Sequence, residues 1–95
     1  MAAYVIADVD VTDPARFEEY RRQVSPTIEK YGGRYLVRGG ATEKVEGNRE
    51  PRRLVIIEFD SMERARQWYH SPEYSGPIKL RHQSARTNLI FVEGA

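Results

Sequence analysis

One short apolar segment, Arg52 to Asp60, constrains the fold of this chain more than any other feature of the sequence. It is rich in β-branched residues and too short for a buried helix, so it predicts a central β-strand that is covered on both faces. Side chains alternate along a strand. One face is then purely apolar and carries Val55, Ile57 and Phe59. The other face is mixed and carries Leu54, Ile56 and Glu58.

The segments around this strand have the patterns of further strands and helices. Alternation indicates strands, and Asp13-Pro14 and Asp60-Ser61 are typical helix starts. In chain order, the expected elements are a strand at 3–11, a helix from 14 to about 31, a strand at 34–38, a turn-rich connection at 41–51, a helix from 61, a helical piece at 73–84 and a strand at 87–93.

Glycine and proline residues are expected to interrupt these helices. Pro26 should kink the first helix or divide it after Val24, because proline cannot donate the backbone hydrogen bond. Gly32-Gly33 should end that helix, with one of the pair at positive φ, where alanine would be costly, and with the other more tolerant. Gly76-Pro77 should break the helical piece at 73–84, whose buried side would include Ile78.

The order β-α-β-β-α-β predicts one α+β domain, residues 1–95, with the ferredoxin-like sandwich fold and a four-stranded antiparallel sheet. The helices would cover one face of that sheet. The other face would carry an apolar patch of the kind that marks an interface, made of Tyr4, Ile6, Leu54 and Ile56. The expected cover is the sheet of a second copy, which gives a homodimer with a closed, barrel-like interior.

Charge and composition exclude several classes of partner. Lys plus Arg number 15 and Asp plus Glu 14, interspersed along the chain, so no nucleic-acid surface is predicted. There is no cysteine, and no apolar stretch approaches the length that spans a membrane. The start of the chain lacks the pattern of a signal peptide. The expectation is a soluble cytoplasmic protein.

Several motifs together resemble the domain-of-unknown-function family 1330 (DUF1330). They are Ala3-Tyr4-Val5-Ile6, Thr12-Asp13-Pro14, Tyr20, the run from Gly32 to Gly40, Glu46-Gly47, Glu58-Phe59, the run from Ala65 to Tyr69 and Ser71-Pro72-Glu73-Tyr74. The resemblance implies a dimeric α/β barrel, the architecture of antibiotic-biosynthesis monooxygenases, muconolactone isomerase and dye-decolorising peroxidases. It implies no established activity, because shared fold is weak evidence for shared chemistry.

Two acids are the candidate catalytic residues. Asp8 and Glu58 are expected on the interior-facing side of the central strands, where an unpaired carboxylate would be costly. Arg34 should lie near Glu58 and Arg38 near Asp8, as ligand-binding residues. The alternative is that these groups form structural salt bridges at the barrel rim or dimer seam.

An aromatic cluster follows the second helix. Trp68, Tyr69, His70 and Tyr74 are candidate ligand-binding residues, although Trp68 and Tyr69 also fit simple core packing. The helix end at Ser71-Pro72 could offer backbone N–H groups to an anion. The two histidines have no spaced partner motif, so neither a metal site nor a cofactor is predicted.

Two hypotheses therefore remain for the function. One is an enzyme that holds an apolar or aromatic molecule in the barrel interior and shifts a proton, or carries out oxygenase-type chemistry, without a cofactor. The other is a non-catalytic ligand-binding or assembly module with a structural network of ion pairs. The expected pocket is lined by Asp8, Arg38, Glu58, Trp68 and Tyr74, with Glu58 as its key polar group.

Overall fold

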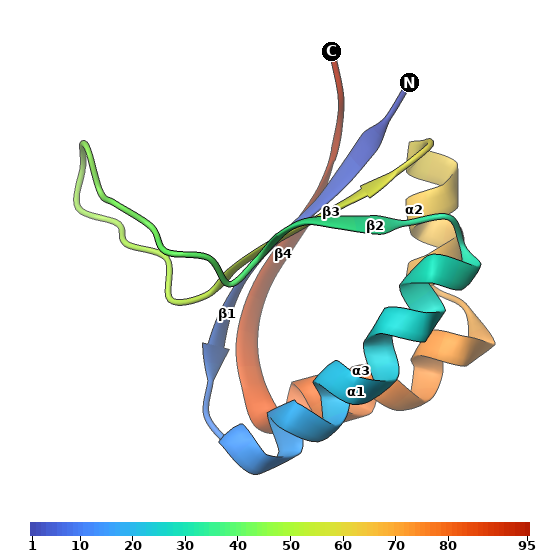
Figure 1. Ribbon diagram of the computed structural model, residues 1–95, viewed down its shortest axis with the longest axis horizontal. Helices are drawn as coiled ribbons and strands as arrows, with labels where there is room; N and C mark the ends of the chain where they lie inside the picture. The colour runs from blue at the N-terminus through green and yellow to red at the C-terminus, as the bar shows by residue number, and fades with distance from the viewer.

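The computed structural model describes residues 1–95 as an antiparallel sheet with helices on one side (Figure 1). The elements are β1 (Ala3–Val11), α1 (Pro14–Lys30), β2 (Arg34–Arg38), β3 (Leu54–Phe59), α2 (Met62–Tyr69), α3 (Pro72–Ser84) and β4 (Ala85–Glu93). The strand order is β2-β3-β1-β4, so the two strands predicted to be central are central. The predicted α+β ferredoxin-like class is confirmed.

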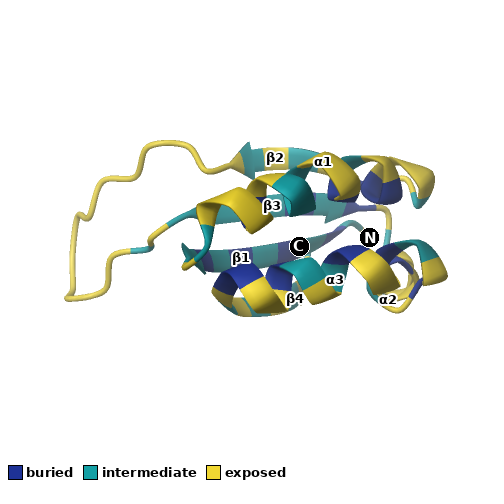
Figure 2. Cartoon of the chain, turned by 90° about the horizontal axis from the view of Figure 1, so that it is seen from below, coloured by how far each residue is buried: buried dark blue, intermediate teal, exposed yellow.

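The helices cover only one face of the sheet (Figure 1), and Figure 2 shows them from below that view, over the strands. The core lies between that face and the helices. Val5, Ile57 and Phe59 are buried there, with Val24 and Ile28 of α1 and Trp68 of α2. The predicted alternation of β1 is visible in its burial, because the odd-numbered residues from Ala3 to Val9 are buried while the even-numbered ones are not.

Side-chain caps fix where the helices begin. Asp13, Ser61 and Ser71 each accept a hydrogen bond from the backbone N–H three residues later, which satisfies a donor that the first helical turn leaves free. The expected division of α1 at Pro26 is wrong, because the helix continues to Lys30. Thr27 and Ile28 are buried after the proline, so core packing holds the last turn despite the lost hydrogen bond.

The expected break at Gly76-Pro77 is also wrong, since α3 runs without interruption from Pro72 to Ser84. Its buried residues are spaced three and four apart and form one stripe: Tyr74, Pro77, Arg81 and Ser84. Packing of this stripe against the sheet and α1 outweighs the local preference of glycine and proline. The connection between β2 and β3 contains no strand, and Val45 within it is exposed.

Both glycines after α1 are required, for different reasons. Gly32 has a φ of 78°, which confirms the expected left-handed residue. Gly33 is then the glycine expected to tolerate a side chain, and that expectation is wrong. A Cβ there would lie 2.6 Å from Cε1 of Phe59 and 2.7 Å from Cγ2 of Ile28, both buried.

Gly33→Ala should therefore lower the free energy of unfolding by about 1 to 3 kcal/mol, the usual cost of overpacking a core. Gly32→Ala should cost about 1 kcal/mol through backbone strain. Gly40→Ala is the matched control, because its φ is not positive and a Cβ added there would have no neighbour within 4 Å. Urea denaturation of the three variants measures these differences, and equal stability of Gly33→Ala and Gly40→Ala would contradict the packing argument.

Candidate ligand-binding cleft

An apolar cleft lies between the covered face of the sheet and the helices. The room that it offers to the centres of water-sized molecules is about 40 Å³, within about 490 Å³ of unfilled space that includes open solvent, and 11 of its 14 lining residues are hydrophobic. Its apolar wall comes from Val5, Ala7 and Val9 of β1, Val55 and Ile57 of β3, Leu89 of β4, Phe17 of α1 and Trp68 of α2. Two wider hollows beside residues 48–52 have no hydrophobic lining residue and are surface depressions next to the β2–β3 connection.

A pair of tyrosine hydroxyls from two helices meets in this cleft. The hydroxyl oxygens of Tyr20 on α1 and Tyr74 on α3 are 2.8 Å apart. Burial raises the pKa of both phenols, and that of Tyr20 lies well above its ordinary value. Both groups therefore remain protonated at neutral pH. One hydroxyl donates to the other, so the second O–H of the pair is free to donate a hydrogen bond to a ligand.

Trp68 belongs both to the core and to the cleft wall. Its side chain is almost fully buried, and its indole Nε1–H donates to Oγ1 of Thr27 at 3.0 Å. Its ring centroid lies 4.3 Å from that of Tyr74 and 5.5 Å from that of Phe59. The two sequence interpretations of Trp68, core residue and pocket residue, are thus compatible.

Three arginines supply the charge of the cleft. A register shift between Tyr35 and Val37 of β2 pairs Arg38 with Val55, so Arg38 takes the covered face of the sheet. Its guanidinium carbon lies 4.6 Å from the ring centroid of Tyr35. Arg53 lies over Phe17 at 5.7 Å, and Arg81 reaches the cleft from α3. No acidic residue lines the cleft.

The predicted grouping of Asp8 and Glu58 with Trp68 and Tyr74 in one pocket is wrong. Side chains alternate along β1 and β3, and Val5, Ala7, Val55 and Ile57 occupy the cleft side, so Asp8 and Glu58 lie on the opposite, open face. Arg34 forms the predicted ion pair with Glu58 there. Oδ1 of Asp8 accepts a hydrogen bond from the backbone N–H of Arg52 at 2.9 Å. Arg38, expected near Asp8, is on the other side because of the register shift.

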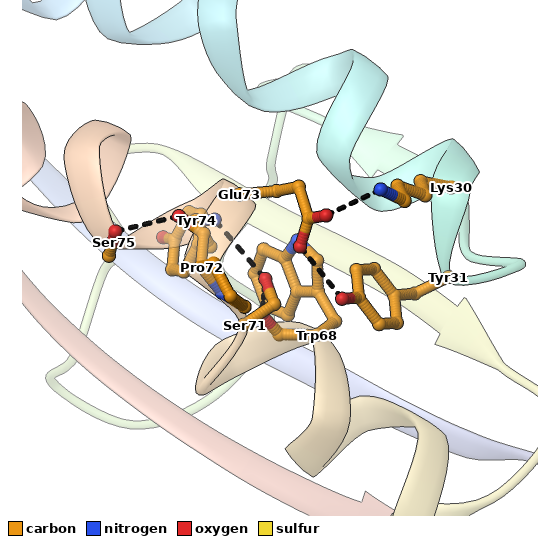
Figure 3. Close-up of polar contacts among 8 residues, drawn as sticks. All are labelled: Lys30, Tyr31, Trp68, Ser71, Pro72, Glu73, Tyr74 and Ser75. Carbon is orange, nitrogen blue, oxygen red and sulfur yellow. Dashed lines mark hydrogen bonds and ion pairs between the residues drawn. The ribbon is translucent and has the colours of Figure 1, made fainter.

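The start of α3 is already occupied by polar groups of the chain itself (Figure 3). Oγ of Ser71 accepts the backbone N–H of Tyr74 at 3.1 Å. Glu73 in the first turn pairs with Lys30 and accepts a hydrogen bond from the hydroxyl of Tyr31 at 2.8 Å, and these two contacts lower the pKa of its carboxyl to about 2. A carboxylate at this helix end disfavours an external anion there, so the end serves to clamp α3 to α1.

Tyr69 and His70 lie outside the cleft. The Tyr69 ring packs edge-on against Phe91 of β4, with centroids 5.7 Å apart. His70 follows the end of α2 and is exposed. Of the predicted ligand-binding residues, Arg38, Trp68 and Tyr74 line the cleft, whereas Arg34, Tyr69 and His70 do not. Tyr69 still packs against Trp68 and Tyr74, with ring centroids 6.1 and 5.8 Å away.

Sequence reasoning missed most of the cleft lining, including the polar side chains of Tyr20, Arg53 and Arg81. Tyr20 belongs to the apolar stripe of the first helix. That pattern explains why its ring is buried, but it does not indicate a function for its hydroxyl. The signal for Arg81 is its spacing of seven from Tyr74, which places both on one helical face. Because the sequence predicts a break at Gly76-Pro77, between Tyr74 and Arg81, it does not place these two residues on one continuous helix.

Neither a membrane-spanning helix nor a cluster of metal ligands is found in the structure. No helix combines the length and apolar character that crossing a membrane requires. No three His, Asp or Glu side chains converge in a way that could hold a metal ion.

Comparison with known proteins gives a family and a fold. The model of the family described as "Domain of unknown function (DUF1330)" matches residues 2–95. No curated protein matches the chain. Among solved structures, RPA0582, a protein of unknown function from Rhodopseudomonas palustris, has a TM-score of 0.82 at 17% identity, covering 99% of this chain and 82% of that one.

Two further structures are similar over nearly their full lengths. SnoaB, a cofactor-independent oxygenase from Streptomyces nogalater, has a TM-score of 0.64 at 10% identity, covering 99% of this chain and 92% of that one. A dimeric protein of unknown function and ferredoxin-like fold from Bacteroides fragilis has a TM-score of 0.58 at 14% identity, covering 98% and 96%. At these identities the likeness shows the fold alone.

Proposed function

This chain belongs to the DUF1330 family, and from that premise we propose that it binds a small apolar or aromatic molecule in the cleft between the sheet and its helices. The observation that carries the proposal is the lining of the cleft, in which 11 of 14 residues are hydrophobic and the remaining polar groups are few. Ligand sites typically combine a mostly apolar wall with a small number of polar groups that orient the ligand. The cleft therefore replaces the barrel interior as the proposed binding site.

The tyrosine pair defines the chemistry that this cleft could support. The hydroxyls of Tyr20 and Tyr74 are 2.8 Å apart and remain protonated, so the one that is not donating to its partner can donate to an oxygen that gains negative charge, such as that of an enolate or phenolate. No carboxylate or histidine lines the cleft to act as a base. We propose that any cofactor-independent proton transfer or oxygenase-type reaction uses the free O–H of this pair as a donor. The fold shared with SnoaB is compatible with such a reaction.

A second proposed function, assembly as a homodimer, rests on the open face of the sheet. Register places Val37, Ile56, Ile6 and Ile90 in one apolar row across all four strands. The flanking rows contain the ion pair of Arg34 with Glu58 and the hydrogen bond of Asp8 with Arg52. These contacts favour a structural role for Asp8 and Glu58, while their proposed catalytic role remains a prediction.

The binding proposal is tested by following the indole N–H resonance of the single tryptophan, Trp68, in two-dimensional ¹⁵N NMR. Titration with single-ring aromatic molecules, both neutral and anionic, should shift this resonance saturably. Leu89→Phe narrows the cleft and should weaken binding by about tenfold or more, a loss comparable to removing apolar contacts of a methylene or two.

The matched control is Val45→Phe, which adds the same aromatic side chain in the exposed β2–β3 connection, outside both the cleft lining and the apolar row of the open face. Its binding should match that of the unmodified protein. If no member of the panel shifts the Trp68 resonance, or if both variants weaken binding equally, the cleft is not the binding site.

A further inference from the structure

We infer that the molecule bound in this cleft is an organic anion, whose carboxylate pairs with Arg81 while its apolar body lies against Trp68 and Leu89. This inference rests on the proposed function, because it names the chemical class of the ligand for the same cleft. It is carried by the arginines, which the apolar wall does not explain.

Arg81 is a buried cation without a counter-charge. It is only 5% exposed, and none of the five ion pairs of the chain includes it. Its Nη2 has only neutral or weak partners, the hydroxyl of Tyr69 at 3.5 Å and Nε2 of His82 at 3.4 Å, while its buried Nε has none. Arginine is rarely buried to this extent unless it is paired, because an unpaired charge away from water is costly.

Arg53 repeats this pattern nearer the β2–β3 connection. Its Nε is also buried without a partner, and its guanidinium lies over the ring of Phe17. Burial, together with the neighbouring cations of Arg21 and Arg38, lowers the pKa of Arg53. Repulsion among these cations would be relieved by a bound anion.

The chain supplies no carboxylate to the cleft. Glu18 of α1 is close enough to Arg53 to act on its charge, but its Oε2 is engaged by Nη1 of Arg21 at 3.2 Å, and it does not line the cleft. Exposed Arg38, half-buried Arg53 and buried Arg81 thus give the cleft positive charge from its surface to its interior. Such an arrangement attracts anions and strengthens their contacts where water is excluded.

The remaining wall selects the kind of anion. A guanidinium presents a planar fork of donors that matches the two oxygens of a carboxylate. The adjacent surface is aromatic and aliphatic, including Trp68, Tyr74 and Leu89, which favours an apolar body over a second charged group. An aromatic or aliphatic carboxylic acid satisfies both requirements, whereas a neutral analogue would leave Arg81 unpaired.

The test compares benzoate with benzamide, which have similar shapes and differ in charge. Dissociation constants come from titrations that follow the Trp68 indole resonance. We expect the carboxylate to bind about tenfold or more tightly than the amide, consistent with a hydrogen bond to a charged group. In Arg81→Met this preference should disappear while the amide binds as before. Arg66→Met, at an exposed arginine of α2 without an ion pair, should retain the preference.

Thermal unfolding checks that each variant is folded. If Arg81→Met does not fold, two other measurements test the inference. The preference for the carboxylate over the amide should fall in Arg53→Met, and it should fall when salt is added to the unmodified protein. Equal affinity for the two compounds would overturn the anion inference and leave the proposed function intact. Failure of both compounds to shift the Trp68 resonance would overturn the two together.

Discussion

Replacing Trp68 with alanine should lower the free energy of unfolding by about 3 to 5 kcal/mol, the range found for removing a large aromatic side chain from a core. Trp68 is 1% exposed and packs against Phe59 and Tyr74. It also satisfies Oγ1 of Thr27 through its indole N–H. Trp68 contacts α1, α3 and the sheet from α2. No neighbour can therefore move into the cavity that the substitution leaves without disturbing several elements. Urea denaturation followed by circular dichroism measures the loss.

Two milder variants separate packing from hydrogen bonding. Trp68→Phe removes the indole N–H but keeps an aromatic ring, so its cost should fall between those of the alanine variant and the unmodified protein. Thr27→Val removes the acceptor, together with the hydrogen bond that Oγ1 donates to the Val24 carbonyl at 2.6 Å, and should cost about 1 to 3 kcal/mol, chiefly because it leaves the buried indole N–H unpaired. A loss below about 1 kcal/mol for Trp68→Ala would contradict the placement of this residue at the centre of the core.

The fold could be predicted from the sequence because two patterns are clear, the alternation of apolar residues in the strands and their spacing of three and four in the helices. Strict alternation in β1 and in the central strand determines which side chains face the helices, and that assignment survives errors of a residue or two at strand ends. Helix interruptions were less predictable. Pro26 and Pro77 weaken helices locally, but the buried residues around them hold α1 and α3 together. Tertiary packing of that kind has no signal in a local pattern.

The candidate site was less predictable, because it depends on which side of the sheet faces a cleft. Glu58 stands out as the one acid in an apolar strand, yet its partner is Arg34 on the open face. The register shift in β2 moves Arg38 to the cleft, and only pairing with β3 reveals such a shift. Arg53 and Arg81 carry the inferred specificity, but arginines at chain positions flanking strands and in a proline-containing helix resemble ordinary surface charges.

Ile56→Asp should convert the proposed homodimer to monomer, weakening association by at least about 100-fold, because a buried unpaired charge costs several kcal/mol. Ile56 is at the middle of the apolar row that crosses the open sheet face, between Val37 and Ile6. Ile90, which continues the row, is 58% exposed in the single chain. Apolar side chains at the centre with polar contacts beside them are the arrangement found in protein interfaces. Light scattering coupled to size-exclusion chromatography at micromolar concentration measures the mass.

Gln67→Glu is the control, since it adds the same charge at an exposed position of α2 and should leave the dimer unchanged. Circular dichroism should show that Ile56→Asp keeps its secondary structure, because residue 56 points away from the core that holds the chain together. The cleft lies on the other face of the sheet, so a folded monomeric variant should also retain ligand binding. A monomeric unmodified protein, or a dimer that persists in Ile56→Asp, would show that a different surface or no surface of this chain mediates association.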